Sequence, residues 1–200
     1  MRKLLQLVAP LLLLAACGGD DDDAGSCSAQ ACGGDLLGKW KLTGGCYTVL
    51  EQPELDFCPS ATATLDLDKA TGTVVFDTDT YSRNFELTAR LTLSLPEKCK
   101  HQPDTELECA DLSGELDGGN PLTCKDGGGG GCSCTALFPS EYKESGIYTN
   151  KGNQVQLVSG LTDYCVSGKN LVMRPSMSVN MKMGQMGDMT STLQTTLEKP

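Results

Sequence analysis

The stretch FELTARLTLSL, residues 85–95, decides the fold. Apolar and polar side chains alternate along it, and successive side chains of a β-strand point to opposite faces of the sheet. The alternation therefore predicts a strand with one dry and one wet face, as in an antiparallel sheet that covers a core. Its eleven residues span roughly 36 Å, a length that suits a barrel or a strongly curved sheet. The apolar face consists of Phe85, Leu87, Ala89, Leu91, Leu93 and Leu95.

The same period of two recurs in shorter segments, and no convincing amphipathic helix interrupts them. We therefore expect an all-β antiparallel meander with short connections. Ala70-Thr71-Gly72 is expected to form a turn between two of these segments. The expected strands are 39–43, 46–50, 62–67 and 73–77 before the deciding stretch, and 134–138, 145–149, 154–158, 163–166, 170–174, 176–183 and 190–198 after it.

Residues 96–131 break the pattern with prolines, glycines and cysteines. We interpret them as a loop insertion stapled by disulfides. The five-glycine run Gly127 to Gly131 has no Lys-Ser/Thr after it and no helix to open, so it is no phosphate-binding loop. A flexible linker is the better interpretation.

Cysteine usage indicates a disulfide framework. Besides Cys17 there is an even set of ten cysteines, as in exported, disulfide-stabilised domains. The candidates are Cys27, Cys32, Cys46, Cys58, Cys99, Cys109, Cys124, Cys132, Cys134 and Cys165. Local pairing suggests Cys27 with Cys32 and Cys99 with Cys109, although the sequence leaves the pairing open.

Metal and catalytic motifs find little support. The closest cysteine pair is Cys132-Ser133-Cys134, whose side chains share one strand face, so we expect each to bridge to another segment rather than form a redox or metal pair. The single histidine, His101, lies in the insertion, where a solvated loop residue is expected. No nucleophile elbow and no His-Glu-x-x-His motif is present. We therefore expect no enzyme.

The first residues have the layout of a signal peptide. Arg2 and Lys3 precede an apolar stretch, Leu4 to Leu14, that is too short to span a bilayer comfortably. The stretch ends in Leu-Ala-Ala-Cys at residues 14–17, which resembles the bacterial lipobox. The resemblance implies cleavage of the signal peptide 1–16, lipidation of Cys17 by acyl chains such as palmitate, and membrane anchoring. An ordinary signal peptide cut elsewhere is the alternative.

The same resemblance places the chain in the cell envelope, and Gly18 after the cysteine favours the outer membrane over the inner. Residues 17–35 are expected to form a flexible tether whose acidic run, Asp20 to Asp23, is solvated rather than metal-binding. Residues 36–200 are expected to form one domain with a single core. Loss of Arg2 and Lys3 changes the formal charge from −10 to −12, which excludes a basic footprint for nucleic acid.

Gly38-Lys39-Trp40 opens the first expected strand of the domain. It resembles the Gly-x-Trp motif that begins the barrel of lipocalins, with Arg174 as the cation over the indole. The chain is also similar to cysteine-rich, lipocalin-like lipoproteins common in myxobacteria. The resemblance implies an eight-stranded calycin-like barrel whose mouth takes a small apolar ligand, although the ten cysteines and the insertion depart from typical lipocalins.

Methionines crowd near the end of the chain. Met183, Met186 and Met189 have the Met-x-x-Met-x-x-Met spacing, and thioethers are soft ligands that suit Cu(I). Methionine also fills irregular cores, which is the competing interpretation. The sequence therefore leaves two function classes: a lipid-anchored binding or structural module whose protein partners it does not identify, or a Cu(I)-binding protein.

Overall fold

The computed structural model describes residues 27, 29–53, 55, 58–102, 105–116, 119–175, 179–182 and 188–200. The expected signal peptide, Cys17 and the run Asp20 to Asp23 lie outside them. No helix among the described residues is both long and apolar enough to span a membrane.

The described chain is built from β-strands with three short 3-10 helices. The helices are η1 (Glu97–Cys99), η2 (Cys109–Leu112) and η3 (Gly128–Gly130). The strands are β1 (Gly38–Glu51), β2 (Thr62–Phe76), β3 (Thr80–Leu95), β4 (His101–Gln102), β5 (Thr105–Glu106), β6 (Gly114–Leu116), β7 (Asn120–Asp126), β8 (Cys132–Ile147), β9 (Thr149–Asn150), β10 (Gln154–Leu157), β11 (Gly160–Ser167), β12 (Asn170–Pro175), β13 (Val179–Lys182) and β14 (Asp188–Glu198).

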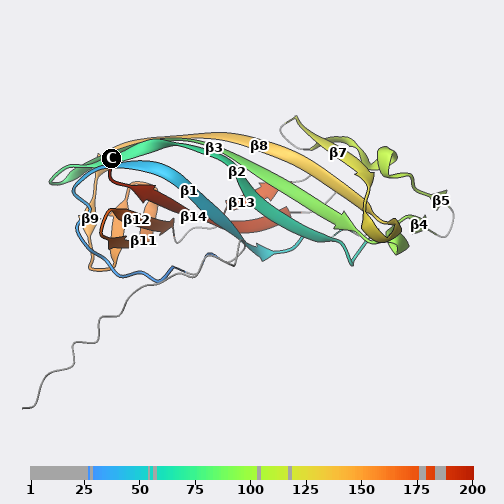
Figure 1. The fold of residues 1–200 in the computed structure, drawn as a ribbon, viewed down its shortest axis with the longest axis horizontal. Coiled ribbons are helices and arrows are strands. Elements are labelled where there is room, and N and C mark those ends of the chain that lie inside the picture. The colour runs from blue at the N-terminus through green and yellow to red at the C-terminus, as the bar shows by residue number, and fades with distance from the viewer. Residues whose placement is uncertain are drawn as a thin grey trace, which may run out of the picture.

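The all-β antiparallel prediction is confirmed. One sheet has the order β6-β7-β8-β3-β2-β1-β14-β12-β11-β10-β9, and β13 pairs with β14. The sheet curls into a half-barrel, with its long strands running along the molecule (Figure 1). The deciding stretch lies in the middle of this sheet, in β3, where it pairs with β2 on one side and β8 on the other.

The expected closed, lipocalin-like barrel is wrong. Within the described chain the sheet ends at β6 on one side and at β9 on the other. The insertion explains part of this, because β7 pairs with the first part of β8, residues 132–136, where a closing strand would have to dock. The opposite edge offers only β9 and β10, which are two and four residues long and too short to pair along the rest of β8.

Several short expected strands are parts of longer ones. The expected turn at residues 70–72 lies inside β2, which pairs with β3 continuously apart from a bulge between Leu67 and Lys69. Gly72 has a φ of 137° and lies against the backbone of Asn84 and Phe85, where a side chain would clash. Glycine in a strand marks such bends and close approaches as well as turns.

Residues 96–131 extend the main sheet and also form a small separate hairpin. The strands β4 and β5 form a separate small hairpin, whereas β6 and β7 continue the main sheet beyond β8. The glycine run closes the hairpin between β7 and β8, with Gly127 N donating to Gly131 O at 2.8 Å and positive φ at Gly129 and Gly130. The prediction of a flexible linker there is therefore wrong: the glycines supply the conformations of a tight loop.

All ten candidate cysteines form disulfides, as predicted. The pairs are Cys27–Cys46, Cys32–Cys165, Cys58–Cys99, Cys109–Cys132 and Cys124–Cys134. The suggested local pairs of Cys27 with Cys32 and of Cys99 with Cys109 are wrong, because the sheet brings more distant segments together. Cys132 and Cys134 each bridge to another segment, so neither sulfur is a free thiol.

The domain begins before residue 36, earlier than the sequence suggested. Gly33 forms a parallel bridge with Cys165 of β11, and Cys32 is disulfide-bonded to the same residue. The backbone N–H groups of Cys32 and Gly33 both donate to Tyr164 O at 3.0 Å. These residues are thus held to the sheet, and the boundary of the tether after residue 35 is wrong.

The buried residues form two separate clusters instead of the expected single core. The cysteine-rich core lies toward the insertion and consists of Leu55, Cys58, Ala61, Ala63, Leu65, Ala89, Leu91, Leu93, Leu95, Cys99, Cys109, Leu116, Leu122, Cys124, Cys132, Cys134, Ala136 and Met189. The Trp40 core consists of Leu36, Trp40, Leu42, Val74, Phe76, Tyr81, Phe85, Leu87, Val155, Leu157, Tyr164, Leu171, Met173 and Leu197. Because β3 runs through both, the inner face of one strand serves two cores.

Candidate ligand-binding site

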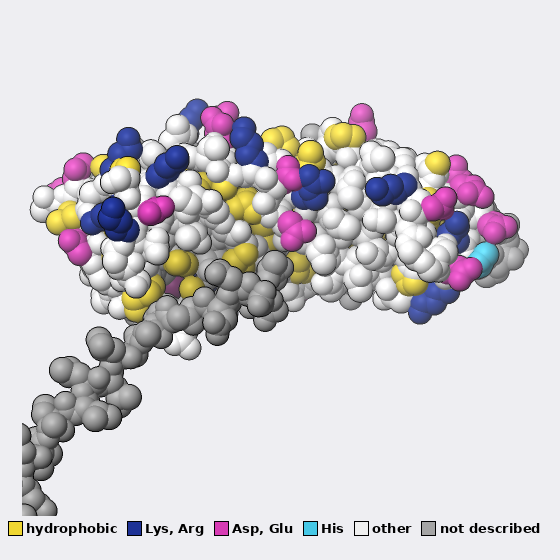
Figure 2. Space-filling model, in the orientation of Figure 1, with side chains coloured by type: hydrophobic (Ala, Val, Ile, Leu, Met, Phe, Trp, Pro, Cys, Tyr) yellow, Lys and Arg dark blue, Asp and Glu magenta, His cyan; other side chains and the backbone are white. Residues whose placement is uncertain are grey.

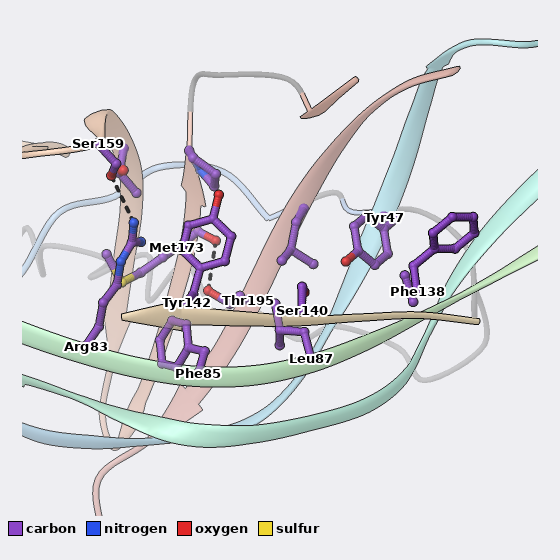
Figure 3. A pocket seen from close by; sticks show the side chains of 14 residues that line it. Tyr47, Arg83, Phe85, Leu87, Phe138, Ser140, Tyr142, Ser159, Met173 and Thr195 are labelled. Atoms are coloured by element: carbon purple, nitrogen blue, oxygen red, sulfur yellow. Dashed lines mark hydrogen bonds between the residues drawn. The ribbon is translucent and has the colours of Figure 1, made fainter. Parts of the chain in front are cut away.

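A hollow of about 330 Å³ lies on the inner face of the half-barrel, between the two cores. Its walls come from β1, β3, β8, β11, β12 and β14 (Figure 3). Residues of the Trp40 core, such as Phe85 and Met173, line one part of the hollow, and Ala89 of the cysteine-rich core lines another. The hollow is therefore the place where the two cores fail to meet.

The register of β3 and β8 builds the main wall. Phe85, Leu87 and Ala89 of β3 lie opposite Tyr142, Ser140 and Phe138 of β8, respectively, and all six line the hollow. Since alternate residues of a strand share a face, this wall follows from the period of two that defines the strand. The side chains of Leu193 and Met173 line the hollow from β14 and β12.

The β8 side of the hollow is open to solvent. The β3 residues of the wall are at most 5% exposed, whereas Tyr142 is 46% exposed and Ser140 is also exposed. Among the described strands, β8 pairs only with β3 beyond residue 136, so no described strand continues the sheet at its other edge. The open edge that prevents barrel closure thus exposes an apolar surface.

One end of the hollow is polar. Arg83 of β3 and Glu144 of β8 are direct cross-strand partners, and Arg83 Nη2 lies 2.5 Å from Glu144 Oε2. Each of these side chains is only 13% exposed. Arg83 Nη2 also donates to Ser159 Oγ at 2.9 Å, and its guanidinium lies 5.3 Å from the centre of the Tyr142 ring. Arg83 and Ser159 line the hollow, and we call them, together with Glu144 beside Arg83, its polar end. Figure 3 shows Arg83 and Ser159 far from Phe138.

Tyrosines flank the hollow in uncharged form. Burial raises the pKa of Tyr81 to about 12, and the neighbouring Glu144 carboxylate contributes to the rise. The Tyr81 hydroxyl also accepts a hydrogen bond from Val158 N at 3.0 Å. Burial, followed by the proximity of Tyr142, raises the pKa of Tyr47 on β1. Among the residues that line the hollow, the charged side chain is therefore Arg83, and its ion-pair partner Glu144, which lies outside the lining, offsets its charge.

The motif at the start of β1 has a packing role. Trp40 is fully buried in the Trp40 core, and its Nε1 donates to Leu36 O at 2.7 Å. The cation over the indole is Lys199, whose Nζ lies 4.7 Å from the ring centre. The prediction that Arg174 occupies this place is wrong.

Arg174 binds elsewhere because its strand register places it beside β11. Its Nη2 donates to Asp163 Oδ2 at 3.0 Å, and Gln154 Nε2 donates to Asp163 Oδ1 at 2.7 Å. The three residues are neighbours across β10, β11 and β12. These hydrogen bonds from Gln154 and Arg174 lower the pKa of Asp163. Gly38 of the same predicted motif has a φ of 113° at the start of β1.

The predicted methionine site lies mostly outside the described residues. Met183 and Met186 belong to that undescribed part, whereas Met189 is fully buried in the cysteine-rich core. Met189 thus has the position that the packing interpretation predicted. The Cu(I) site stays a prediction.

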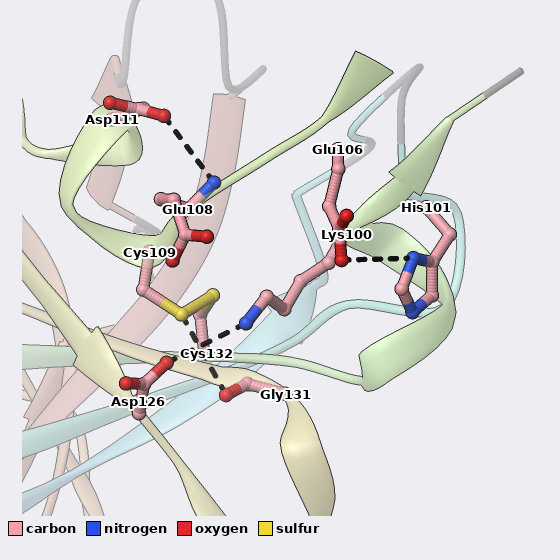
Figure 4. Close-up of polar contacts among 9 residues, drawn as sticks. All are labelled: Lys100, His101, Glu106, Glu108, Cys109, Asp111, Asp126, Gly131 and Cys132. Carbon is pink, nitrogen blue, oxygen red and sulfur yellow. Dashed lines mark hydrogen bonds and ion pairs between the residues drawn. A yellow bond between two sulfur atoms is a disulfide. The ribbon is translucent and has the colours of Figure 1, made fainter. Parts of the chain in front are cut away.

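The predicted loop histidine lies at the tip formed by β4 and β5. His101 Nδ1 is 3.7 Å from Glu106 Oε1, and both side chains are more than half exposed. Nearby, Lys100 Nζ lies 3.6 Å from Asp126 Oδ1, close to the Cys109–Cys132 disulfide (Figure 4). Figure 2 shows acidic side chains gathered with the histidine at this end.

Arg83 and Glu144 are not among the site residues predicted from the sequence. A signal was available, because the alternation of residues 85–95 continues backward and puts Arg83 on the apolar face. A lone charge on an apolar strand face calls for a partner. The register of β3 with β8, which identifies that partner, depends on the structure.

The chain matches no family model, and searches of curated proteins and of solved structures find no match either. The description of the class therefore depends on the fold itself: an open, curled antiparallel sheet with an apolar hollow and five disulfides. Such a disulfide framework indicates a location outside the reducing cytoplasm.

Proposed function

We propose that this protein is a lipid-anchored binding module of the cell envelope that holds a small apolar ligand in the hollow between its two cores. The observation that carries the proposal is the hollow itself. Its volume of about 330 Å³ is near the lower end of the roughly 300–1,000 Å³ typical of ligand pockets. Its walls combine apolar and aromatic side chains with few polar groups, which is the usual composition of such pockets.

The packing around the hollow supports the proposal. A hollow that is open to solvent leaves apolar wall atoms facing water, and their removal from water is favourable. An apolar ligand would cover Phe85, Leu87 and Met173, which line the hollow. The exposed edge at Ser140 and Tyr142 supplies an entrance.

The test is a titration with N-phenyl-1-naphthylamine, an uncharged dye whose emission rises in apolar surroundings. We expect saturable one-to-one binding to the disulfide-intact protein. Ser140→Trp should weaken it at least about tenfold, equivalent to about 1.4 kcal/mol, because an indole at this position in the wall fills the hollow.

Glu141→Trp is the matched control. Glu141 is the next residue of β8, points to the opposite face and contacts Lys143 on the surface, with Lys143 Nζ at 3.0 Å from Glu141 Oε2. This variant should bind the dye like the original chain. Non-saturable binding, or equal loss in both variants, would count against the hollow as the site.

The anchor is a separate part of the proposal and depends on the resemblance of residues 14–17 to a lipobox. In bacteria that process lipoproteins, the chain should incorporate labelled palmitate and fractionate with membranes. Cys17→Ser should abolish the label, because the thiol that accepts the lipid is gone. A Cys17→Ser chain that retains the label would overturn this assignment.

A further inference from the structure

We infer that the ligand of the hollow is an uncharged amphiphile: one hydrocarbon chain with a neutral head that accepts hydrogen bonds, such as a monoacylglycerol. The inference rests on the proposed function and adds the class of ligand. It comes from three features of the hollow, namely its polarity gradient, its charge balance and the hydroxyl group of Ser159 at its polar end.

The polarity gradient follows β3. From Arg83 through Phe85 and Leu87 to Ala89, successive inward side chains run from charged to apolar. These six residue steps cover roughly 20 Å along the strand. Figure 3 shows the same order, with Arg83 and Ser159 at one end and Phe138 at the other. A long, narrow molecule with one polar end matches this gradient, and a volume of about 330 Å³ favours one chain over the two of a diacyl lipid.

The charge balance excludes a charged head. Arg83 and Glu144 already offset one another at 2.5 Å, and both are largely buried. An anionic head would place a second negative charge beside Glu144, and a cationic head a second positive charge beside Arg83. A charged head of either sign would lose its hydration on binding and would find no free counter-charge in the site. This loss is unfavourable at a mostly buried position. A neutral head avoids this cost.

A hydroxyl group lines the polar end beside Arg83. Ser159 lines the hollow, and its Oγ accepts a hydrogen bond from Arg83 Nη2 at 2.9 Å. A hydroxyl can accept and donate at the same time. The Ser159 hydroxyl can therefore donate its proton to the carbonyl of a neutral head.

The experiment uses three ligands with the same number of carbons in the chain: 1-monododecanoylglycerol, dodecanoate and dodecylammonium. Each displaces N-phenyl-1-naphthylamine from the disulfide-intact protein at pH 8, below its micelle concentration. We expect the monoacylglycerol to bind at least about tenfold more tightly than either ion.

Two charge variants test the reason for this order. Glu144→Gln leaves Arg83 unbalanced and should raise the affinity for dodecanoate at least about tenfold. Arg83→Gln leaves Glu144 unbalanced and should lower the affinity for dodecanoate while raising that for dodecylammonium. Circular dichroism of each variant checks that the sheet is intact, and the ranking in the original chain stands as a test if one variant fails to fold.

The outcomes separate this inference from the proposed function. If dodecanoate binds the original chain as tightly as the monoacylglycerol, the neutral-head class is wrong while the hollow remains a binding site. If the dye binds but none of the three ligands displaces it, the amphiphile class is wrong. If the dye itself does not bind, the proposed function fails first.

Discussion

Removal of the disulfide between Cys32 and Cys165 should lower the free energy of unfolding by about 4 kcal/mol. The two cysteines are 133 residues apart, the largest separation of the five bridges. In the chain-entropy view, a bridge stabilises by restricting the unfolded chain, and its contribution grows with the logarithm of the loop length. The other disulfides between residues 32 and 165 shorten the effective loop. The stabilising contribution changes little as a result, because it depends on the logarithm of the loop length.

The measurement is urea unfolding of the variant Cys32→Ala/Cys165→Ala, followed by circular dichroism. The variant Cys27→Ala/Cys46→Ala is the control, because these cysteines, like Cys32 and Cys165, are not buried but are only 19 residues apart. It should lose about 3 kcal/mol. The slope of unfolding free energy against urea should rise in both variants, since their unfolded states expose more surface.

The position of Cys32 suggests the result that would contradict this prediction. The bridge also holds the segment at Gly33 against β11, where Val166 N donates to Gly33 O at 2.8 Å. If its loss only freed this segment, amide exchange would rise near Gly33 and Val166 while global stability stayed unchanged. The chain-entropy contribution would then be absent.

The sequence predicted the strands better than the sheet they form. Alternation is a local property, so the deciding stretch appears in β3 with its apolar face inward, and Leu91 and Leu93 are fully buried. Closure of the sheet into a barrel depends on whether its two edge strands pair. Local alternation in the sequence does not determine this long-range pairing. The short lengths of β9 and β10 and the docking of β7 on β8 leave the sheet open. The hollow is a consequence of that missing closure.

The same limit applies to the disulfides. An even number of cysteines in an exported chain predicted that all ten are paired, and they are. The partners follow from the register of the sheet: Cys124 and Cys134 lie directly opposite one another on β7 and β8. Proximity in sequence was therefore a poor guide for Cys27, whose partner Cys46 lies on β1.

The site was only partly predictable. The expectation of a small apolar ligand came from the resemblance of the Gly38-Lys39-Trp40 motif to lipocalins, yet the structure is not a closed barrel and Trp40 serves packing. Arg83, which gives the hollow its polar end, and its ion-pair partner Glu144 belong to no motif. They meet because β3 and β8 pair across the intervening insertion.

Replacement of Trp40 with alanine should lower the free energy of unfolding by about 4 kcal/mol. The indole is fully buried, and its removal leaves a large void in the Trp40 core. It also leaves Leu36 O without the hydrogen bond from Nε1, which holds the first described segment against β1. Trp40→Phe keeps most of the ring volume but loses this hydrogen bond, so it should cost about 2 kcal/mol.

Leu37→Ala is the control, because Leu37 is a nearby apolar side chain that is 46% exposed. It should change stability by no more than about 0.5 kcal/mol. Circular dichroism is the required readout, since Trp40 is the only tryptophan and its variants lose the intrinsic fluorescence signal. A loss of less than about 1 kcal/mol in Trp40→Ala would mean that the core collapses around the void. The hollow beside Phe85 would then be equally able to collapse, so this variant also measures how rigidly the two cores hold the hollow open.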